Sequence, residues 1–251
     1  YIIFDKITSV IGELNTLFSN KMSNNFIAGW TFQNEDRGTY GEIFPLIEIQ
    51  KEGQTYISTG FEPFTPDNQL QYTTYQLQDN LSLYLNKHTL TAGLSLERLQ
   101  FRNVFFPGSQ GVFVYNSLED FYSDLSDAKA NPNRTSSPVE LRRFQYRYSA
   151  LPGGAEPVQP TRVTYGGIYL QDEIAVTNQL MVSAGIRMDV PVFDDTGFEN
   201  QQVLGQTYRD PEGNALKVST KKLPDPQFLF SLRLGFNWDA MGDRSLQLRG
   251  G

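Results

Sequence analysis

The most constraining feature of the sequence is a strict alternation of apolar and polar residues in two runs, 165–176 and 180–190, separated by a very short turn. Alternation with a period of two is typical of a β-strand with one apolar and one polar face. Because the apolar residues have even numbers in both runs, a loop at Thr177–Gln179 keeps them on one side of the predicted hairpin. The opposite side carries Gln, Glu, Arg and Asp. A long hairpin that is apolar outside and charged inside is typical of a membrane-spanning β-barrel.

The same alternation recurs along the chain and predicts seven strands and the start of an eighth. The remaining predicted strands lie at about 10–18, 26–32, 75–85, 90–96 and 228–238, and the last begins at Leu246. Short turns alternate with long segments at about 34–71, 107–162 and 193–226. Outer-membrane barrels show this pattern, because tight periplasmic turns alternate with large external loops. The sequence therefore predicts an all-β fold, a segment of an antiparallel transmembrane β-barrel with long extracellular loops.

Composition narrows the classes of function. No run of about 18 apolar residues occurs, so no membrane helix is predicted. The net charge of −7 argues against a nucleic-acid partner, which requires clustered Lys and Arg. The lack of cysteine excludes a disulfide framework and a thiolate metal site. Since the chain lacks an initiator Met and stops inside an alternating run, we expect residues 1–251 to be part of a larger barrel without a plug domain.

Two local features depart from plain alternation. The motif Ser117-Leu118-Glu119-Asp120 is typical of a helix N-terminus, and apolar residues at helical spacing follow it until Asn131-Pro132. The second long segment is therefore predicted to carry a short amphipathic helix. Asp79 and Asp172 have the parity of the predicted lipid-facing residues, where a charge is costly at mid-membrane and cheap near the interface. Either they lie low on the wall, or a β-bulge turns them inward.

Enzymatic chemistry is not indicated. The only histidine, His88, lies in a predicted tight turn, and no G-x-S-x-G, P-loop or H-E-x-x-H motif occurs. Acidic clusters at Glu35-Asp36, Asp194-Asp195 and Asp210-Pro211-Glu212 offer oxygen ligands for Ca²⁺, but none has EF-hand spacing. We therefore predict a protein that is not an enzyme and needs no cofactor.

Charged residues on the predicted lumen side are the candidate solute-binding residues. These are Glu97, Glu173, Arg187 and Arg233. Lumen positions tune selectivity in barrels, although a hydrogen-bonded wall that only hydrates the interior needs the same residue types. The basic, aromatic run 142–148 is predicted to form strand-like loop structure, with an anionic ligand as an alternative role. Exposed aromatic residues of the long loops either grip a ligand or pack within the loops.

Several segments resemble the barrel repeats of TonB-dependent outer-membrane receptors, in particular the Oar-like and SusC-like branch of Bacteroidota. They are Tyr169–Glu173, Gly185–Pro191, Leu232–Trp238, Leu248–Gly251 and the loop motif Asn116–Phe121. The resemblance covers most of residues 71–251, and residues 1–70 are compatible with it. It implies a large barrel in the bacterial cell outer membrane that imports a nutrient solute such as a peptide, glycan or chelate.

The resemblance also implies partners. They are the lipid bilayer, the TonB–ExbB–ExbD complex acting through a plug that this chain lacks, a small solute and a candidate lipoprotein lid. Two alternatives stay open. One is a soluble β-sandwich whose apolar face packs against a second sheet. The other is a closed eight-stranded outer-membrane barrel with a structural or adhesive role, whose interior would be filled by side chains. Pairing of the first strand with 246–251 would indicate this small barrel.

Overall fold

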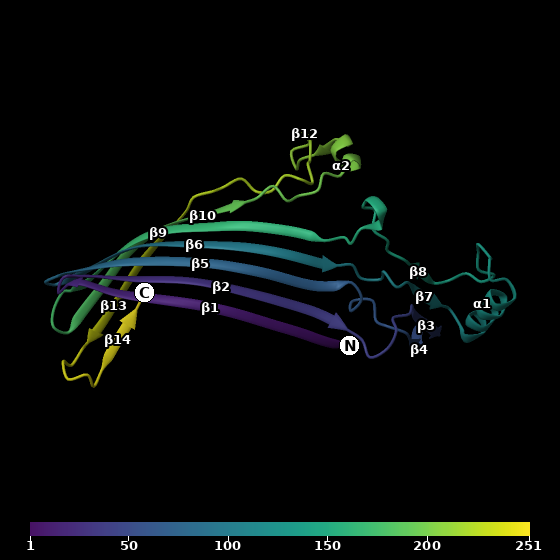
Figure 1. The fold of residues 1–251 in the computed structure, drawn as a ribbon, viewed down its shortest axis with the longest axis horizontal. Coiled ribbons are helices and arrows are strands. Elements are labelled where there is room, and N and C mark those ends of the chain that lie inside the picture. Colours follow the sequence, from purple (N-terminus) through teal and green to yellow (C-terminus); the bar gives the residue numbers. More distant parts are fainter. The chain divides into compact units, whose positions relative to one another are not determined.

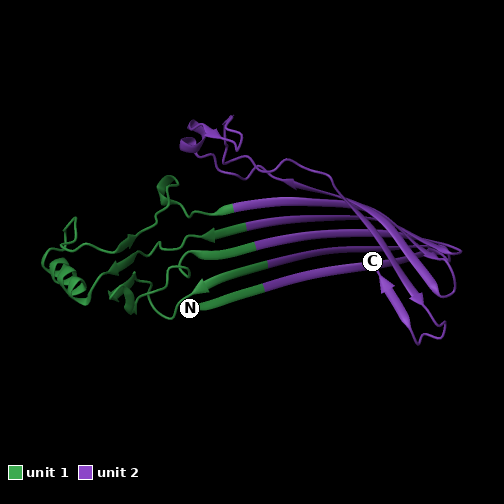
Figure 2. Cartoon of the chain, turned by 180° about the vertical axis from the view of Figure 1, so that it is seen from behind, with its two compact units in different colours: residues 1–6, 33–71, 102–159 green, residues 7–32, 72–101, 160–251 purple.

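The computed structural model describes every residue from Tyr1 to Gly251. The chain forms two compact units, which Figure 2 shows in green and purple. Unit 1 comprises residues 1–6, 33–71 and 102–159, and unit 2 comprises residues 7–32, 72–101 and 160–251. None of the helices is long and apolar enough to cross a membrane.

The main sheet has eight strands, each hydrogen-bonded to the next main-sheet strand along the chain (Figure 1). In order these are β1 (Ile2–Ser19), β2 (Met22–Gly38), β5 (Asn68–Leu85), β6 (His88–Phe105), β9 (Gln159–Ala175), β10 (Leu180–Phe193), β13 (Leu229–Asp239) and β14 (Gln247–Gly250). The predicted all-β fold, with seven strands and the start of an eighth, is confirmed. Several strands extend beyond their predicted ends, because polar residues there still pair through the backbone.

Two of the short connections are tighter than predicted, and the one between β9 and β10 is one residue longer than the predicted loop 177–179. Only Asn20 and Lys21 separate β1 from β2, and only Asn86 and Lys87 separate β5 from β6. Asn86 has a φ of 50°, a left-handed conformation that asparagine tolerates better than most residues. Four residues, 176–179, join β9 to β10, and the even-numbered residues on both strands still share one face.

A second, smaller sheet lies within unit 1. Its strands are β3 (Leu46–Lys51), β4 (Gln54–Thr59), β7 (Val112–Tyr115) and β8 (Arg143–Gln145), in the order β4-β3-β7-β8. Segment 34–71, which the sequence indicated only as a long loop, therefore contains two strands of its own, β3 and β4. β3 pairs in parallel with β7, and Leu46, Val112 and Val114 form a buried apolar cluster between them. This pairing joins residues more than 60 positions apart, which a local pattern does not reveal.

Helix α1 (Leu118–Ala130) confirms the predicted loop helix. The Ser117 hydroxyl accepts a hydrogen bond from the Asp120 backbone N–H, as an N-cap does. The Phe121 ring meets the Tyr115 ring edge-on, with 5.3 Å between their centroids. Three other short elements occur: η1 (Pro152–Gly154), α2 (Gln201–Gly205), and the two-stranded pairing of β11 (Tyr208–Arg209) with β12 (Ala215–Leu216).

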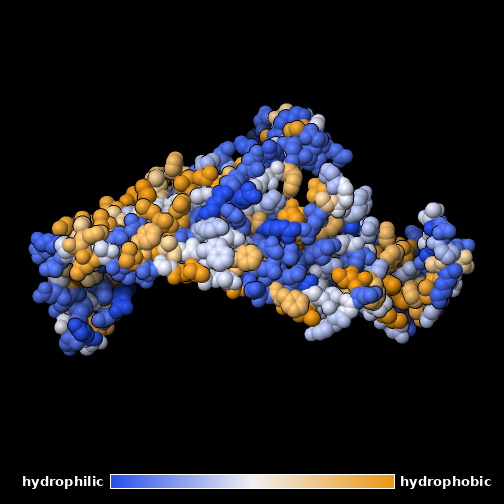
Figure 3. Space-filling view, in the orientation of Figure 1, coloured by the Kyte–Doolittle hydropathy of each residue, from blue (hydrophilic) through white to orange (hydrophobic).

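The register of the last strands separates their two faces. Ile186 lies opposite Leu170 on β9 and Leu232 on β13, so the even-numbered residues of the three strands share a face. That face is apolar and open, with Leu232 81% and Leu234 71% exposed. Figure 3 shows apolar side chains gathered over the strands of unit 2. The sandwich alternative required these side chains to be buried against a second sheet, and they are not.

Asp79 and Asp172 lie on this apolar face and both have partners. Asp172 lies opposite Ala184 in an uninterrupted register, so the proposed bulge at this position is wrong. The Asp172 Oδ2 lies 2.7 Å from His88 Nδ1. The Asn24 side-chain amide donates a 2.5 Å hydrogen bond to Asp79 Oδ1. Each carboxylate thus pairs with a polar side chain of the neighbouring strand.

The sheet does not close on itself. β1 pairs only with β2, and β14 pairs only with β13, so these strands form its two edges. A closed eight-stranded barrel required β1 to pair with the last strand, so this alternative is not favoured.

Candidate functional site

The polar face of unit 2 carries a hydrogen-bond network that crosses several strands. On β9, the Tyr169 hydroxyl donates to Asn80 Oδ1 on β5. The Asn80 amide donates in turn to Asn25 Oδ1 on β2 at 3.4 Å. Asn25 then donates to Glu13 Oε1 on β1 at 2.6 Å. Because these residues lie far apart in sequence, the network ties non-adjacent segments together through side chains as well as backbone.

A second polar cluster centres on Arg187 of β10. Its Nε donates to both carboxylate oxygens of Asp189 at 2.8 and 2.9 Å, and its Nη2 donates to Ser95 Oγ at 2.8 Å. The guanidinium also lies 5.4 Å from the centre of the Tyr169 ring, a cation–π distance. Asp189 is only 6% exposed, so its charge is matched by a partner within hydrogen-bonding distance, as a buried carboxylate requires.

Two glycines make room for these clusters. A Cβ at Gly93 would overlap the Tyr169 ring and lie 2.7 Å from Asn80 Oδ1. A Cβ at Gly167 would overlap the Asp189 carboxylate and lie 2.5 Å from Arg187 Nη2. The large polar side chains thus lie across neighbouring strands where those strands have no side chain of their own.

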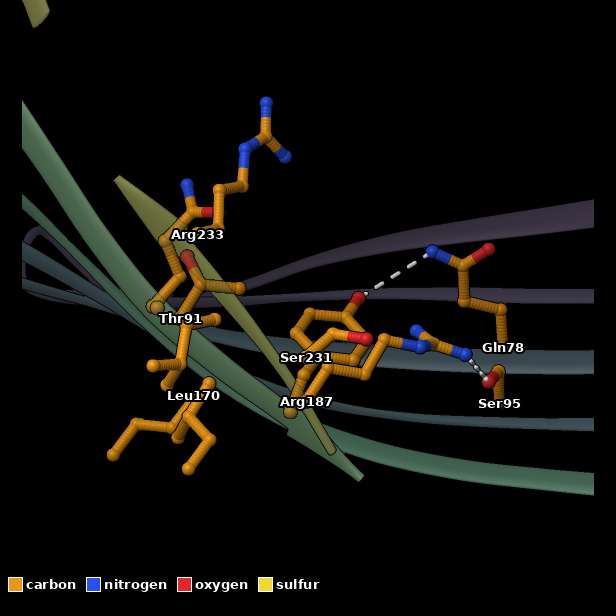
Figure 4. A pocket seen from close by; sticks show the side chains of 12 residues that line it. Gln78, Thr91, Ser95, Leu170, Arg187, Ser231 and Arg233 are labelled. Carbon is orange, nitrogen blue, oxygen red and sulfur yellow. Dashed lines mark hydrogen bonds between the residues drawn. The ribbon is translucent and has the colours of Figure 1, made fainter. Parts of the chain in front are cut away.

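A hollow of about 570 Å³ opens beside the Arg187 cluster. Its lining is mixed, with Leu170, Ile186 and Leu232 among the apolar residues. The polar side chains include Gln78, Ser95, Arg187, Ser231 and Arg233, which come from four strands, and the two arginines are its charged groups. Figure 4 shows Arg187 directed at Ser95, and Arg233 extending away from that pair. The lining includes no Asp or Glu. This arrangement favours a solute with an anionic or hydrogen-bond-accepting group.

The predicted solute-binding residues are only partly brought together. Arg187 and Arg233 line the same hollow, and Glu97 lines a neighbouring one together with Arg187. Glu173 lines a third hollow with Arg233 and accepts a 3.0 Å hydrogen bond from Gln171. Arg187 is occupied by Asp189, whereas Arg233 and Glu97 form no ion pair or side-chain hydrogen bond. Their role in binding remains a prediction.

Sequence reasoning missed Tyr169, Asn80 and Asp189 as members of the polar network. Each has the parity of the polar face, but so do many residues that make no such contact. A usable signal was glycine at odd-numbered, polar-face positions of two predicted strands. Gly93 leaves room for Tyr169, and Gly167 leaves room for Asp189.

The acidic clusters and His88 have protein partners. Asp194 pairs with Arg98, Asp195 pairs with Lys221 at 2.9 Å, and Asp210 accepts hydrogen bonds from Asn214. No three His, Cys, Asp or Glu side chains converge as a metal-binding group would require. The absence of a cofactor stays a prediction.

In unit 1, a buried carboxylate fastens α1 to its surroundings. Asp124 accepts hydrogen bonds from Tyr115 Oη at 2.7 Å and from Ser137 Oγ, and it pairs with Arg134 at 2.9 Å. Burial alone would raise the pKa of the Asp124 carboxyl, but the hydrogen bonds from Arg134, Ser137 and Tyr115 outweigh it and lower that pKa. Burial and the hydrogen bond to Asp124 raise the pKa of the Tyr115 hydroxyl. These contacts hold α1 against β7 and the segment that follows the helix.

Polar pairs bound the apolar face of β6. His88 pairs with Asp172 at one end, and Arg98 pairs with Asp194 at the other, with Leu90, Leu94 and Leu96 between them. The ten residue steps from 88 to 98 correspond to about 33 Å of strand, or about 25 Å of height at a strand tilt of about 40°. An apolar band of about 25 Å is the height of the lipid-facing belt in outer-membrane barrels.

Comparison with protein families decides what kind of sheet this is. The model of the outer membrane beta barrel domain matches residues 5–251. The chain belongs to this outer-membrane β-barrel family. Membership places it in the bacterial outer membrane, as predicted, and the apolar face is the face that meets lipid in such barrels.

Comparisons with curated proteins and with solved structures add little about the function of this family member. No curated protein matches the sequence. Among solved structures, the chain is similar to the ferric-catecholate import receptor Fiu from E. coli K12 in its open form, with a TM-score of 0.49 and 13% sequence identity. The match covers 95% of this chain and 34% of the receptor, so the chain spans about a third of the receptor's length.

Proposed function

We propose that this chain is a wall segment of a TonB-dependent outer-membrane transporter that takes up a nutrient solute such as a peptide, glycan or chelate. The observation that carries the proposal is the contrast between the two faces of the main sheet. One face is open and apolar, and the other carries hydrogen-bonded polar clusters and a cationic hollow. A barrel that only anchors or adheres needs no such open polar lining, whereas a transport path does.

The roles follow from how each side chain is held. Arg187 is fixed by Asp189 and Ser95, so it is held against the wall with its charge balanced by the Asp189 carboxylate. Arg233 and Glu97 have no partner in the chain and are available to a passing solute. We assign solute contact to Arg233 and Glu97, and support of the wall to Arg187 and Glu173.

The open edges of the sheet support a larger barrel. Unpaired backbone groups cannot face lipid, because hydrocarbon offers them no hydrogen-bond partner. β1 and β14 therefore require further strands beside them. Transporters of the family that the sequence resembles couple to TonB through a plug, so coupling to TonB–ExbB–ExbD and a lipoprotein lid belong to this proposal for the whole protein.

The test is uptake by the whole protein in an outer membrane with and without TonB. Cells that depend on the transporter are grown on a panel of scarce peptides, glycans and iron chelates. We expect growth on at least one solute, and loss of that growth when TonB is deleted. Growth that is indifferent to TonB would overturn the proposal.

A variant pair locates the path within the wall. Arg233→Gln is expected to lower uptake of the identified solute several-fold. Arg244→Gln removes the same charge from the turn between β13 and β14 and is expected to leave uptake unchanged. Equal uptake by the two variants would remove Arg233 from the path while leaving TonB dependence intact.

A further inference from the structure

The run 142–148 in unit 1 presents cations that the chain itself does not neutralise. Arg142, Arg143 and Arg147 are exposed and form no ion pair or side-chain hydrogen bond. In the same loop, Arg134 is occupied by Asp124 and Asp127. Because the chain as a whole carries a net charge of −7, three free guanidinium groups within six residues form a local basic patch on an acidic protein.

The backbone of this run is held in place at both ends. The Arg142 N–H donates to the Val114 carbonyl at 2.9 Å, and the Arg147 N–H donates to the Gly108 carbonyl at 3.3 Å. Between them, Phe144 lies opposite Phe113, with ring centroids 5.0 Å apart. The spacing of the cations is therefore set by the small sheet rather than by a free loop.

β8 is an edge strand. In the small sheet it pairs only with β7, as the order β4-β3-β7-β8 requires and Figure 1 shows. An exposed edge offers backbone N–H and C=O groups to an additional extended chain. Phe144 is 58% and Tyr148 74% exposed, so apolar ring surface lies beside that edge.

We propose that β8 and the following residues dock an extended acidic peptide, which adds to the edge of β8 and places its carboxylates against Arg143 and Arg147. Arg143 and Arg147 are four residues apart, which is about 13 Å in an extended chain. Acidic side chains four residues apart on an extended peptide have the same spacing. The backbone edge favours a polypeptide over an anionic polysaccharide, which has no amide groups to pair with it. The proposal rests on unit 1 alone and does not depend on solute transport.

The test measures binding of a labelled peptide to outer-membrane vesicles that carry the protein. The probe is a fluorescein-labelled decapeptide of alternating Thr and Glu, and vesicles without the protein supply the blank. We expect saturable binding at low salt that weakens sharply toward 1 M salt, since the Debye length falls to about 3 Å there. No binding at low salt would overturn the proposal.

Matched variants separate this patch from general charge. Arg143→Gln with Arg147→Gln is expected to weaken binding roughly five- to thirty-fold, the effect of losing two exposed ion pairs at about 0.5–1 kcal/mol each. Lys51→Gln with Lys129→Gln removes the same charge elsewhere in unit 1 and is expected to change binding less than about two-fold. Unchanged heat-modifiable migration shows that both variants fold. Equal weakening by the two pairs would contradict a specific site.

Two further probes test what is recognised. The same peptide with alternate backbone nitrogens methylated keeps its charges but loses edge hydrogen bonds, and we expect it to bind at least about ten-fold more weakly. Polygalacturonate carries carboxylates without a peptide backbone. If the methylated peptide or polygalacturonate binds as well as the unmodified peptide, the patch recognises anions and not an extended acidic peptide.

Discussion

At the residue scale, Gly167 is a position in the polar cluster where one added methyl group should destabilise the fold. A Cβ there would overlap the Asp189 carboxylate and crowd Arg187 Nη2, so Gly167→Ala must displace the cluster or shift β9. We expect a loss of about 1–3 kcal/mol of stability, as for other overpacked sites. The measurement is the urea midpoint of the folded, heat-modifiable form in detergent micelles.

The neighbouring glycine supplies the control. A Cβ at Gly166 would meet only Val190 Cγ1, at 3.8 Å. Gly166→Ala should therefore be neutral or slightly stabilising, since alanine costs less backbone entropy in a strand. Equal midpoints for the two variants would show that the Asp189 cluster does not need the space at Gly167.

The sequence predicts which face of the sheet each side chain lies on, but it does not predict which side chains are in contact. The parity of Tyr169 and Arg187 predicts that both leave the sheet on its polar side. Their contacts with Asn80 and Ser95 depend on register between strands that are distant in sequence. The environment of Asp172 could not be predicted for the same reason, because its partner His88 lies 84 residues away.

At the scale of elements, the polar contacts of β9 indicate how deep each of its lipid-facing residues lies in the membrane. Ile168 lies midway between Thr164, which accepts from Arg98, and Asp172, which pairs with His88. Ile168→Arg should cost about 2–4 kcal/mol, because it places a cation near the bilayer midplane. Val176, just past the end of β9, should tolerate the same change at about 0–1 kcal/mol. Equilibrium unfolding in lipid vesicles measures both, and equal costs would refute the assigned depth.

Helix α1 should respond to acid through Asp124. Its folded-state pKa is lowered below the ordinary value of 3.8, so the ionised form stabilises the fold. That contribution is complete above about pH 5 and is lost as the pH falls through the folded-state pKa. Hydrogen exchange of amides 118–130, corrected for intrinsic rates, should show protection falling below pH 4.

Two variants separate this effect from general acid destabilisation. Asp124→Asn should lower protection already at pH 7 and remove most of its pH dependence. Glu140→Gln, an exposed change in the same unit, should keep the wild-type profile. A wild-type profile in Asp124→Asn would show that the carboxylate does not hold the helix.

Strands and helices could be predicted where neighbouring residues in the sequence carry the pattern that specifies them. The alternating strands and the capping box of α1 are each read within about a dozen residues. The small sheet was missed, because β3 and β7 are short and pair in parallel across a long stretch of chain. The pairing that buries Leu46 beside Val112 is a tertiary contact with no period of its own.

For the whole molecule, the outer-membrane location and the proposed function both relate to the two faces of the main sheet. The apolar face fits an outer-membrane barrel wall, and the polar face is the one that the proposal assigns to a transport path. The fold class followed from sequence because a lipid-facing wall imposes a long period-two pattern. The hollow beside Arg233 could not be predicted, because it depends on how five strands are placed side by side.

The most direct measurement uses the lack of cysteine in this chain. Single spin labels are placed at each position from 229 to 237 of β13 in a cysteine-free background, in native-like lipid. Collision rates are recorded with oxygen, which enters lipid, and with a water-soluble nickel complex. The account predicts a period of two, with Leu232 and Leu234 favouring oxygen and Arg233 favouring nickel. If neighbouring positions respond alike, or Leu232 meets neither reagent, the apolar face does not contact lipid and the account is contradicted.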